Sequence, residues 1–98
     1  MVRHIILWKL KPELEDKEKV MQNAKRALES LAGVVPGLLK VRVQTQKLPS
    51  SSADMMLYTE FEDASSLAAY QKHPAHVDAA STYVRPFVAE RVCIDYEA

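Results

Sequence analysis

The order of its apolar patterns limits the folds open to this sequence more than any other feature. Four segments, 2–10, 39–44, 55–61 and 89–96, have the apolar and β-branched content of strands, and apolar residues recur at every second position along them. Between the first and second of these segments, and again between the third and fourth, apolar residues recur at helical spacing. The chain is therefore predicted to run strand, helix, strand, strand, helix, strand.

Capping residues mark the ends of the predicted helices. Asp16 or Glu15 can begin the first helix, and Gly33 ends it. Asp63 or Ser65 can cap the start of the second helix. This order of elements packs naturally as one four-stranded antiparallel sheet with helices on one face. The predicted fold class is therefore α+β, of the ferredoxin-like type.

Length and charge limit the number of domains and the possible partners. A chain of 98 residues has room for one core, so residues 1–98 are expected to form a single domain. Lys and Arg number 13, Asp and Glu number 13, and the basic residues are scattered. Binding to nucleic acid or to an anionic membrane depends on clustered positive charge, so neither partner is expected.

Cysteine content and hydropathy bear on the compartment. Cys93 is the single cysteine, which excludes an internal disulfide. It lies in an apolar, β-branched run, which indicates a strand residue rather than a reactive thiol. No segment approaches the roughly 20 apolar residues of a membrane span, and the apolar run at the start is too short for a signal peptide. A cytoplasmic protein is therefore predicted.

The first predicted strand carries large apolar side chains on both faces. Ile5 and Leu7 lie on one face, and Ile6 and Trp8 lie on the other. Helices on one side of the sheet can cover only one face, and the chain has no further element for the second. We therefore expect a homodimer packed sheet against sheet. Trp8, the closing strand and inward sheet positions such as Val43 are expected near the interface.

The segment Tyr70–Val77 carries the side chains best suited to chemistry. It places one phenol and two imidazoles, which can move or hold protons near neutral pH, around a proline. A residue before proline avoids helical geometry, whereas proline itself suits the first position of a helix. We therefore expect the helix carrying Tyr70 to end near Lys72, and a second helix, carrying His76, to begin at Pro74.

Two other interpretations of this segment stay open. It is also typical of a bent surface helix whose histidines are solvated. A metal site is less favoured, because Pro74 breaks the helix that would align His73 with His76, and no Cys pair or acidic residue stands at ligand spacing nearby. No metal ion and no cofactor are therefore expected.

His4 is the third candidate histidine. It shares the apolar face of the first strand with Ile6 and Trp8, where an unpaired imidazole is costly. One interpretation is a structural histidine satisfied by a neighbouring carbonyl. The other places His4 in a cavity between the sheet and the broken helix, across from Tyr70 and His76, as a small-molecule site requires.

Four stretches together resemble the stress-responsive A/B barrel (Dabb) family: Tyr70–Val77, Tyr83–Phe87, Asp95–Tyr96 and the opening His4–Lys11. They follow the family's order from about residue 3 to residue 96, and His73–Val77 is the most specific of the matching motifs. The resemblance implies a ferredoxin-like fold that assembles into a dimeric α/β barrel.

The resemblance also implies an activity. The best-understood family member is a plant polyketide cyclase, which makes olivetolic acid by aldol closure of a linear β-polyketide thioester without a cofactor. The match places its catalytic histidine at His76, its catalytic tyrosine at Tyr70 and a pocket histidine at His4. A base with a pKa near 7 can remove a proton flanked by two carbonyls, while a phenol hydrogen-bonds the developing enolate. Trp8 and Leu28 are expected to line the substrate pocket.

Three classes of function stay open. The first is a cofactor-free enzyme acting on a β-dicarbonyl or polyketide-type substrate by general acid/base chemistry. The second is a non-catalytic stress-responsive protein or a binder of a small apolar carbonyl ligand. The third is a cofactor-free monooxygenase, which would consume dioxygen with a quinol substrate. A sizeable cavity containing Tyr70 and His76 favours an enzyme, and a filled core there favours the second class.

Overall fold

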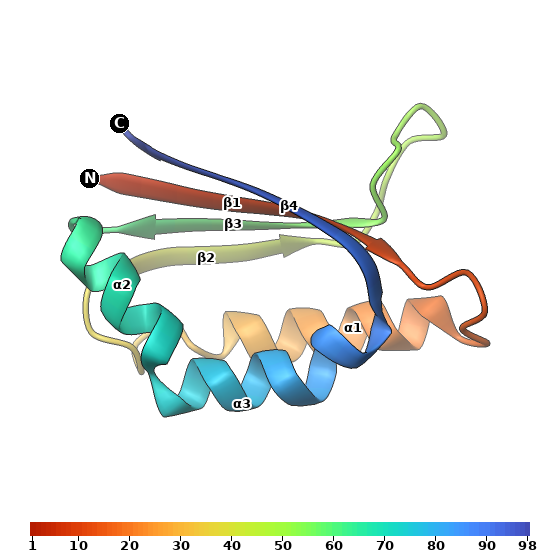
Figure 1. Cartoon of the computed structure of the whole chain (residues 1–98), viewed down its shortest axis with the longest axis horizontal. Coiled ribbons are helices and arrows are strands. Elements are labelled where there is room, and N and C mark those ends of the chain that lie inside the picture. The colour runs from red at the N-terminus through yellow and green to blue at the C-terminus, as the bar shows by residue number, and fades with distance from the viewer.

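The computed structural model describes every residue from Met1 to Ala98. One four-stranded antiparallel sheet is covered on one side by all three α-helices (Figure 1). The elements follow in the order β1 (Val2–Leu10), α1 (Lys17–Glu29), β2 (Leu38–Gln44), β3 (Met55–Phe61), α2 (Ala64–Lys72), α3 (Pro74–Tyr83), a 3₁₀ turn η1 (Arg85–Phe87) and β4 (Val88–Glu97). The predicted order and the ferredoxin-like α+β fold are confirmed.

The strands lie in the order β2-β3-β1-β4, so β4 forms one edge and the two termini lie side by side (Figure 1). In the antiparallel pairing of β1 with β4, His4 lies opposite Asp95 and Ile6 lies opposite Cys93. Directly opposed residues point to the same face of a sheet. Asp95 and Cys93 therefore share the face of His4 and Ile6.

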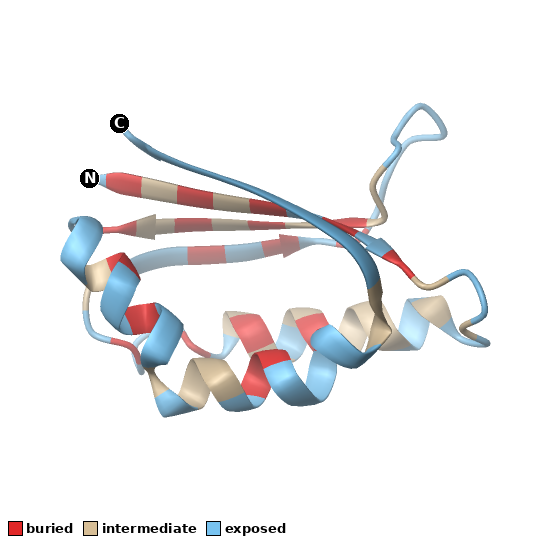
Figure 2. Cartoon of the chain, viewed as in Figure 1, coloured by how far each residue is buried: buried red, intermediate tan, exposed pale blue.

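The core lies between the sheet and the helices. Along β1 and β3 buried residues alternate with less buried ones, as expected for strands with one covered face (Figure 2). Trp8 and Val43, at 4% and 3% exposure, belong to this core. The prediction that they lie near an interface between copies was wrong, because they project toward the helices and not toward the open face.

The closing strand differs from its neighbour. Every residue of β4 after Val88 is exposed, although the strand pairs with β1 along its length (Figure 2). On the open face, Leu7 of β1 lies beside Val92, and Ile94 and Tyr96 continue the exposed apolar surface along β4. The sheet therefore has one covered apolar face and one uncovered apolar strip.

The expected break in the second helix is confirmed. His73 has extended backbone angles, with ψ at 131°, and it ends α2 while capping α3. Its Nδ1 accepts a hydrogen bond from the backbone N–H of Ala75 at 3.1 Å. Pro74 is the first residue of α3, where its missing N–H leaves no hydrogen bond unmade.

Side chains cap the other two helix starts. Asp16 accepts a hydrogen bond from the backbone N–H of Lys19, and Asp63 accepts one from that of Ser66. Of the alternatives that the sequence left open, the aspartate is the cap in both cases. None of the helices combines the length and the apolar character that crossing a membrane requires.

Candidate functional site

The break between α2 and α3 brings Tyr70 and His76 into contact. Their ring centroids lie 4.1 Å apart with the ring planes inclined by 35°. In one uninterrupted helix, residues six positions apart would point about 120° away from each other around the helix axis. The change of direction at His73 therefore creates this pair.

Two further rings extend the pair into a cluster from four different elements. The ring of Tyr70 lies 4.9 Å from that of Phe61 on β3 and 6.4 Å from that of His4 on β1. The rings of His4, Phe61, Tyr70 and His76 are called the ring cluster below. The structure thus brings together the three residues that the sequence singled out for chemistry.

Polar atoms inside the ring cluster lack partners. Tyr70 is fully buried, yet its hydroxyl makes no hydrogen bond, and Nδ1 of His76 is also buried without a partner. An unpaired polar group inside a protein costs roughly 1–3 kcal/mol, and native proteins seldom leave one without a reason. Two such atoms on rings in contact are typical of a place that receives a ligand.

The surroundings of the His76 imidazole and the Tyr70 phenol keep both groups uncharged. Burial lowers the pKa of His76, a hydrogen bond involving the backbone of Gln71 opposes this shift, and the guanidinium groups of Arg85 and Arg91 lower it further. The His76 imidazole is therefore neutral at neutral pH and can accept a proton. Burial raises the pKa of Tyr70, so its phenol stays protonated and can only donate a hydrogen bond as an uncharged group.

A cavity of about 180 Å³ lies between the sheet and α3. Its lining includes His76 together with Trp8 and Leu28, the two residues expected in the pocket. Arg85 and Arg91 supply the positively charged part of the wall. The cavity is therefore apolar for most of its surface, with one imidazole and two guanidinium groups that could contact a polar ligand. His4 and Tyr70 are not part of this wall.

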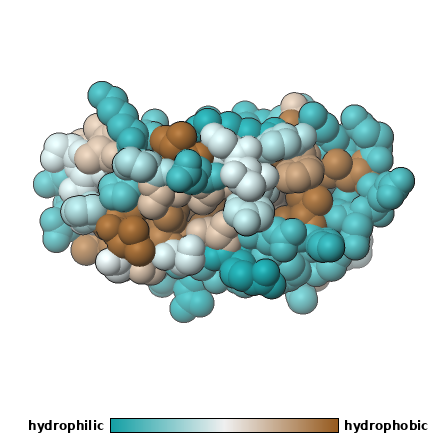
Figure 3. Space-filling view, turned by 90° about the horizontal axis from the view of Figure 1, so that it is seen from below, coloured by the Kyte–Doolittle hydropathy of each residue, from teal (hydrophilic) through white to brown (hydrophobic).

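A larger groove of about 770 Å³ lies between α1 and α3 on the outside of the helices. Seen from the helix side, apolar residues gather in a broken band across this face, with hydrophilic residues around them (Figure 3). The groove contains none of the ring-cluster residues. The smaller cavity beside His76 is therefore the better candidate for a site.

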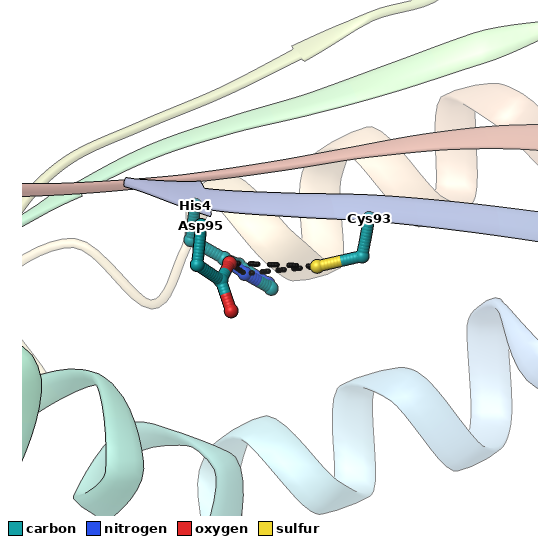
Figure 4. Close-up of side chains that lie close together, drawn as sticks. All are labelled: His4, Cys93 and Asp95. Atoms are coloured by element: carbon teal, nitrogen blue, oxygen red, sulfur yellow. Dashed lines mark hydrogen bonds and ion pairs between the residues drawn. The ribbon is translucent and has the colours of Figure 1, made fainter. Parts of the chain in front are cut away.

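His4 has a partner that neither interpretation of the sequence included. Its Nδ1 lies 2.5 Å from a carboxylate oxygen of Asp95, rather than against a backbone carbonyl. The Sγ of Cys93 lies 3.6 Å from the same nitrogen and 3.4 Å from the same oxygen. The three side chains leave the sheet on the side of the helices and meet at the β4 edge (Figure 4).

Cys93 is a strand residue, as predicted, but it does not pack in an apolar core. Its side chain is exposed beside Asp95. Burial, the hydrogen bond to Asp95 and the charge of Asp95 raise the pKa of the thiol, against a smaller lowering by Arg91. At neutral pH the thiol is therefore protonated and a weak nucleophile in the absence of a bound cation.

The whole chain matches one protein family. The model of the stress responsive A/B barrel domain covers residues 2–98. The chain belongs to the stress-responsive A/B barrel (Dabb) family. The resemblance seen in the sequence is thereby confirmed at the level of the family.

Solved structures support the same conclusion about the fold of this Dabb protein. A dimeric ferredoxin-like protein of unknown function from Bacteroides fragilis is 32% identical, with a TM-score of 0.91, over 99% of this chain and 95% of that one. A second such protein, from Thermobifida fusca, is 22% identical, with a TM-score of 0.85 over 99% and 90%. The hydroxynitrile lyase of Passiflora edulis is 17% identical, with a TM-score of 0.79 over 97% and 90%. Among curated proteins, none matches this sequence.

The association of Asp95 and Cys93 with His4 was not among the predictions made from the sequence. The signal was nevertheless available, because alternation along the predicted strand 89–96 puts Val92, Ile94 and Tyr96 on one face and leaves Cys93 and Asp95 on the other. In a ferredoxin-like sheet the first and last strands are neighbours, as they are here. Combining these two facts would have placed Asp95 and Cys93 beside the first strand, on the face of His4.

Proposed function

We propose that this Dabb protein is a cofactor-independent enzyme that removes a proton from a carbon flanked by two carbonyl groups. His76 is the general base and Tyr70 is its partner. The observation that carries the proposal is the neutral imidazole of His76 on the cavity wall, in contact with the buried, unpartnered phenol of Tyr70. A base and an uncharged hydrogen-bond donor side by side are what enolate formation needs.

In the proposed step the imidazole of His76 takes the proton, and the electron pair of the broken C–H bond becomes the enolate. The Tyr70 hydroxyl donates a hydrogen bond to the enolate oxygen when that oxygen reaches it. The enolate carbon then attacks a third carbonyl, either farther along the same molecule or on a second molecule, forming a C–C bond, and the resulting alkoxide recovers a proton from the imidazolium. One positioned base of this kind contributes roughly 10²–10⁴-fold to the rate.

The size and charge of the cavity narrow the substrate class. Its volume of about 180 Å³ corresponds to about six water-sized groups and lies below the roughly 300–1,000 Å³ of typical ligand sites. A short β-dicarbonyl compound suits this volume better than a long polyketide thioester. Arg85 and Arg91 on the wall favour a substrate with a carboxylate or several oxygens.

The test is a turnover assay with short β-keto acids, β-diketones and β-keto thioesters, in which the cyclised or condensed product is measured. His76→Ala should lower turnover at least ~100-fold, because a positioned base is lost. His73→Asn is the matched control: it removes an imidazole from the same segment but can still cap α3. Full activity of the His76→Ala variant on a substrate of the wild type would contradict the base assignment.

A ligand-binding function without turnover is the second candidate, and the same unpaired atoms at Tyr70 and His76 favour it. Binding that depends on His76, with the compound recovered unchanged, would support this alternative. The fold itself admits enzymes, since the related passion-fruit protein is a hydroxynitrile lyase. A cofactor-free monooxygenase stays a further possibility, which dioxygen uptake in the presence of a quinol would reveal.

We further propose that the protein is a homodimer packed through the open face of the sheet. Exposed apolar side chains of β1 and β4 form a strip there, including Leu7, Val92 and Ile94, at 40%, 61% and 58% exposure. Uncovered apolar strips of this kind usually mark an interface. Two ferredoxin-like relatives are dimeric, which supports a dimer for this chain. The cytoplasmic location stays a prediction.

A further inference from the structure

We propose that His4, Cys93 and Asp95 bind a divalent transition-metal ion of the zinc type. One imidazole nitrogen, one sulfur and one carboxylate oxygen, each on a different residue, lie within 4.8 Å of one another. The donors come from the two neighbouring strands β1 and β4 and converge at the sheet edge (Figure 4). The inference goes beyond the proposed function and does not depend on it, because the site does not include His76.

The spacing of the donors fits a tetrahedral ion. Zinc binds nitrogen and oxygen at about 2.0–2.2 Å and sulfur at about 2.3 Å, so tetrahedral donors lie about 3.3–3.6 Å apart. The Cys93 sulfur is 3.6 Å from the His4 nitrogen and 3.4 Å from the Asp95 oxygen. Only the separation of His4 and Asp95, 2.5 Å, is shorter than an ion requires.

The one movement that an ion needs is small and falls on the least constrained group. Asp95 would have to withdraw from His4 by about 1 Å to reach tetrahedral spacing. The Asp95 side chain is 43% exposed, whereas that of His4 is 2% exposed. His4 is also fixed through its backbone, because the Thr59 hydroxyl donates to its carbonyl at 2.6 Å. A buried, fixed imidazole and a movable carboxylate together make a site that an ion can enter.

The direction of approach argues against a catalytic Cys-His-Asp relay. In such a relay the carboxylate and the nucleophile occupy opposite nitrogens of the imidazole. Here the sulfur of Cys93 and the oxygen of Asp95 both approach Nδ1 of His4. Convergence of three donors around one point is the arrangement of a chelate.

A second observation lies beside the cluster. The hydroxyl of Tyr70 is buried without a partner, and the Tyr70 ring is a neighbour of the His4 ring, at 6.4 Å. Three protein donors leave the fourth position of a tetrahedral ion to water, as in exchangeable zinc sites. A water bound to the ion there would be a possible hydrogen-bond partner for the unpaired polar atoms of the ring cluster.

The types of donor atom indicate which ion the site would bind, and their position shows how the ion would reach it from solvent. Imidazole with thiolate suits zinc and similar ions, whereas calcium and magnesium prefer oxygen donors alone. Cys93 is exposed on the helix side of β4, so an ion can arrive from solvent, and the proposed sheet-to-sheet interface on the other face leaves the site open. Binding would displace the Cys93 thiol proton and the proton that lies between His4 Nδ1 and Asp95, so proton release accompanies binding.

The experiment uses Co²⁺ as a spectroscopic probe and Zn²⁺ as its competitor. The full chain, treated with a chelator and kept reduced, is titrated with Co²⁺ while the thiolate-to-cobalt absorption is recorded. One ion per chain with this absorption, displaced by Zn²⁺ and not by Mg²⁺ or Ca²⁺, is expected. Absence of the absorption, or binding no tighter than millimolar, would overturn the proposal.

Variants separate the three-donor site from a lone thiol. Cys93→Ser should abolish the absorption and weaken Zn²⁺ binding at least ~10-fold, since the thiolate ligand is lost. Asp95→Asn should weaken binding while leaving the thiol in place, and unchanged binding by this variant would remove Asp95 from the ligands and overturn the three-donor site. Glu97→Gln, an exposed acid on the same face of β4, is the matched control and should bind as the wild type does. His76→Ala should also bind normally, which keeps this outcome distinct from failure of the proposed base.

Discussion

β1 and β4 lie side by side and pair along nearly their whole lengths, yet their environments are opposite. β1 is flanked by two strands and alternates between the covered and the open face, whereas β4 is an edge strand whose residues after Val88 are all exposed. Both contain similar β-branched and aromatic residues. The difference has two causes: β4 lies at the edge of the sheet, and its helix-side positions are mostly polar, whereas those of β1 are mostly apolar.

The two strands also divide the chemistry between them. β1 contributes His4 to the ring cluster and Trp8 to the cavity wall, both deeply buried. β4 adds the exposed carboxylate of Asp95 and the thiol of Cys93 at the sheet edge, and an apolar strip on the opposite face of the sheet. A rigid inner wall beside an accessible edge is a suitable arrangement for a small-molecule site.

The largest expected effect is on the stability of the buried strand. Trp8→Ala should lower the free energy of unfolding by roughly 3–5 kcal/mol, because it leaves a cavity in the core. Val92→Ala, an exposed position on β4, should change it by less than about 1 kcal/mol when measured on the monomer. Urea unfolding of both variants tests the contrast, and equal losses would mean that β4 is as buried as β1.

The next effect concerns the open face. Ile94→Lys should raise the dissociation constant of the proposed dimer at least ~100-fold, about 2.7 kcal/mol, because an unpaired charge would be buried at the interface. Light scattering over a range of protein concentrations measures the change. Glu97→Lys changes the charge of the same strand on its helix side, away from the open face, and is the comparison. A wild-type chain that is monomeric at every concentration tested would contradict the proposed dimer.

A smaller effect is expected at Tyr70, on the covered side of the sheet, where one variant should affect turnover and stability differently. Tyr70→Phe removes a buried hydroxyl that has no partner, so the free energy of unfolding should stay the same or rise by up to about 1 kcal/mol. Turnover of a substrate should nevertheless fall, though less than for His76→Ala. Thermal unfolding and the turnover assay together check this prediction. A marked loss of stability would show that the hydroxyl is structural.

The smallest effect is a pH dependence of stability. Because burial lowers the pKa of His76 in the folded state, the unfolded chain binds more protons at this residue between the two pKa values. Its contribution to stability should therefore be complete above about pH 6.5 and decline as the pH falls below that value. His76→Gln should flatten this part of the profile relative to the wild type, whereas His73→Asn should not. Stability that rises on acidification through this range would contradict the burial of His76.

Much of the fold could be predicted because its signals are local. Alternation identified the strands, Asp16 and Asp63 were among the expected caps, and the restricted backbone before Pro74 predicted the break at His73. Each of these signals depends on neighbours a few residues away. Local sterics and hydrogen bonding therefore sufficed to determine them from the sequence.

Other features depended on contacts between distant segments. Alternation assigned Trp8 and Val43 to a face of the sheet, but only helix packing decided that this face is the covered one, so their predicted place at an interface was wrong. The contact of Tyr70 with His76 required the actual angle between α2 and α3.

The contact between His4 and Asp95 shows most clearly where prediction from the sequence ends, because the two positions are 91 residues apart. The sequence by itself determined the residue types and the parity of each strand. The tertiary structure decided which strand lies at the edge, which rings touch and which donors converge. The physical reason is that pairing register and packing depend on how the whole chain buries its apolar surface, which no single segment determines.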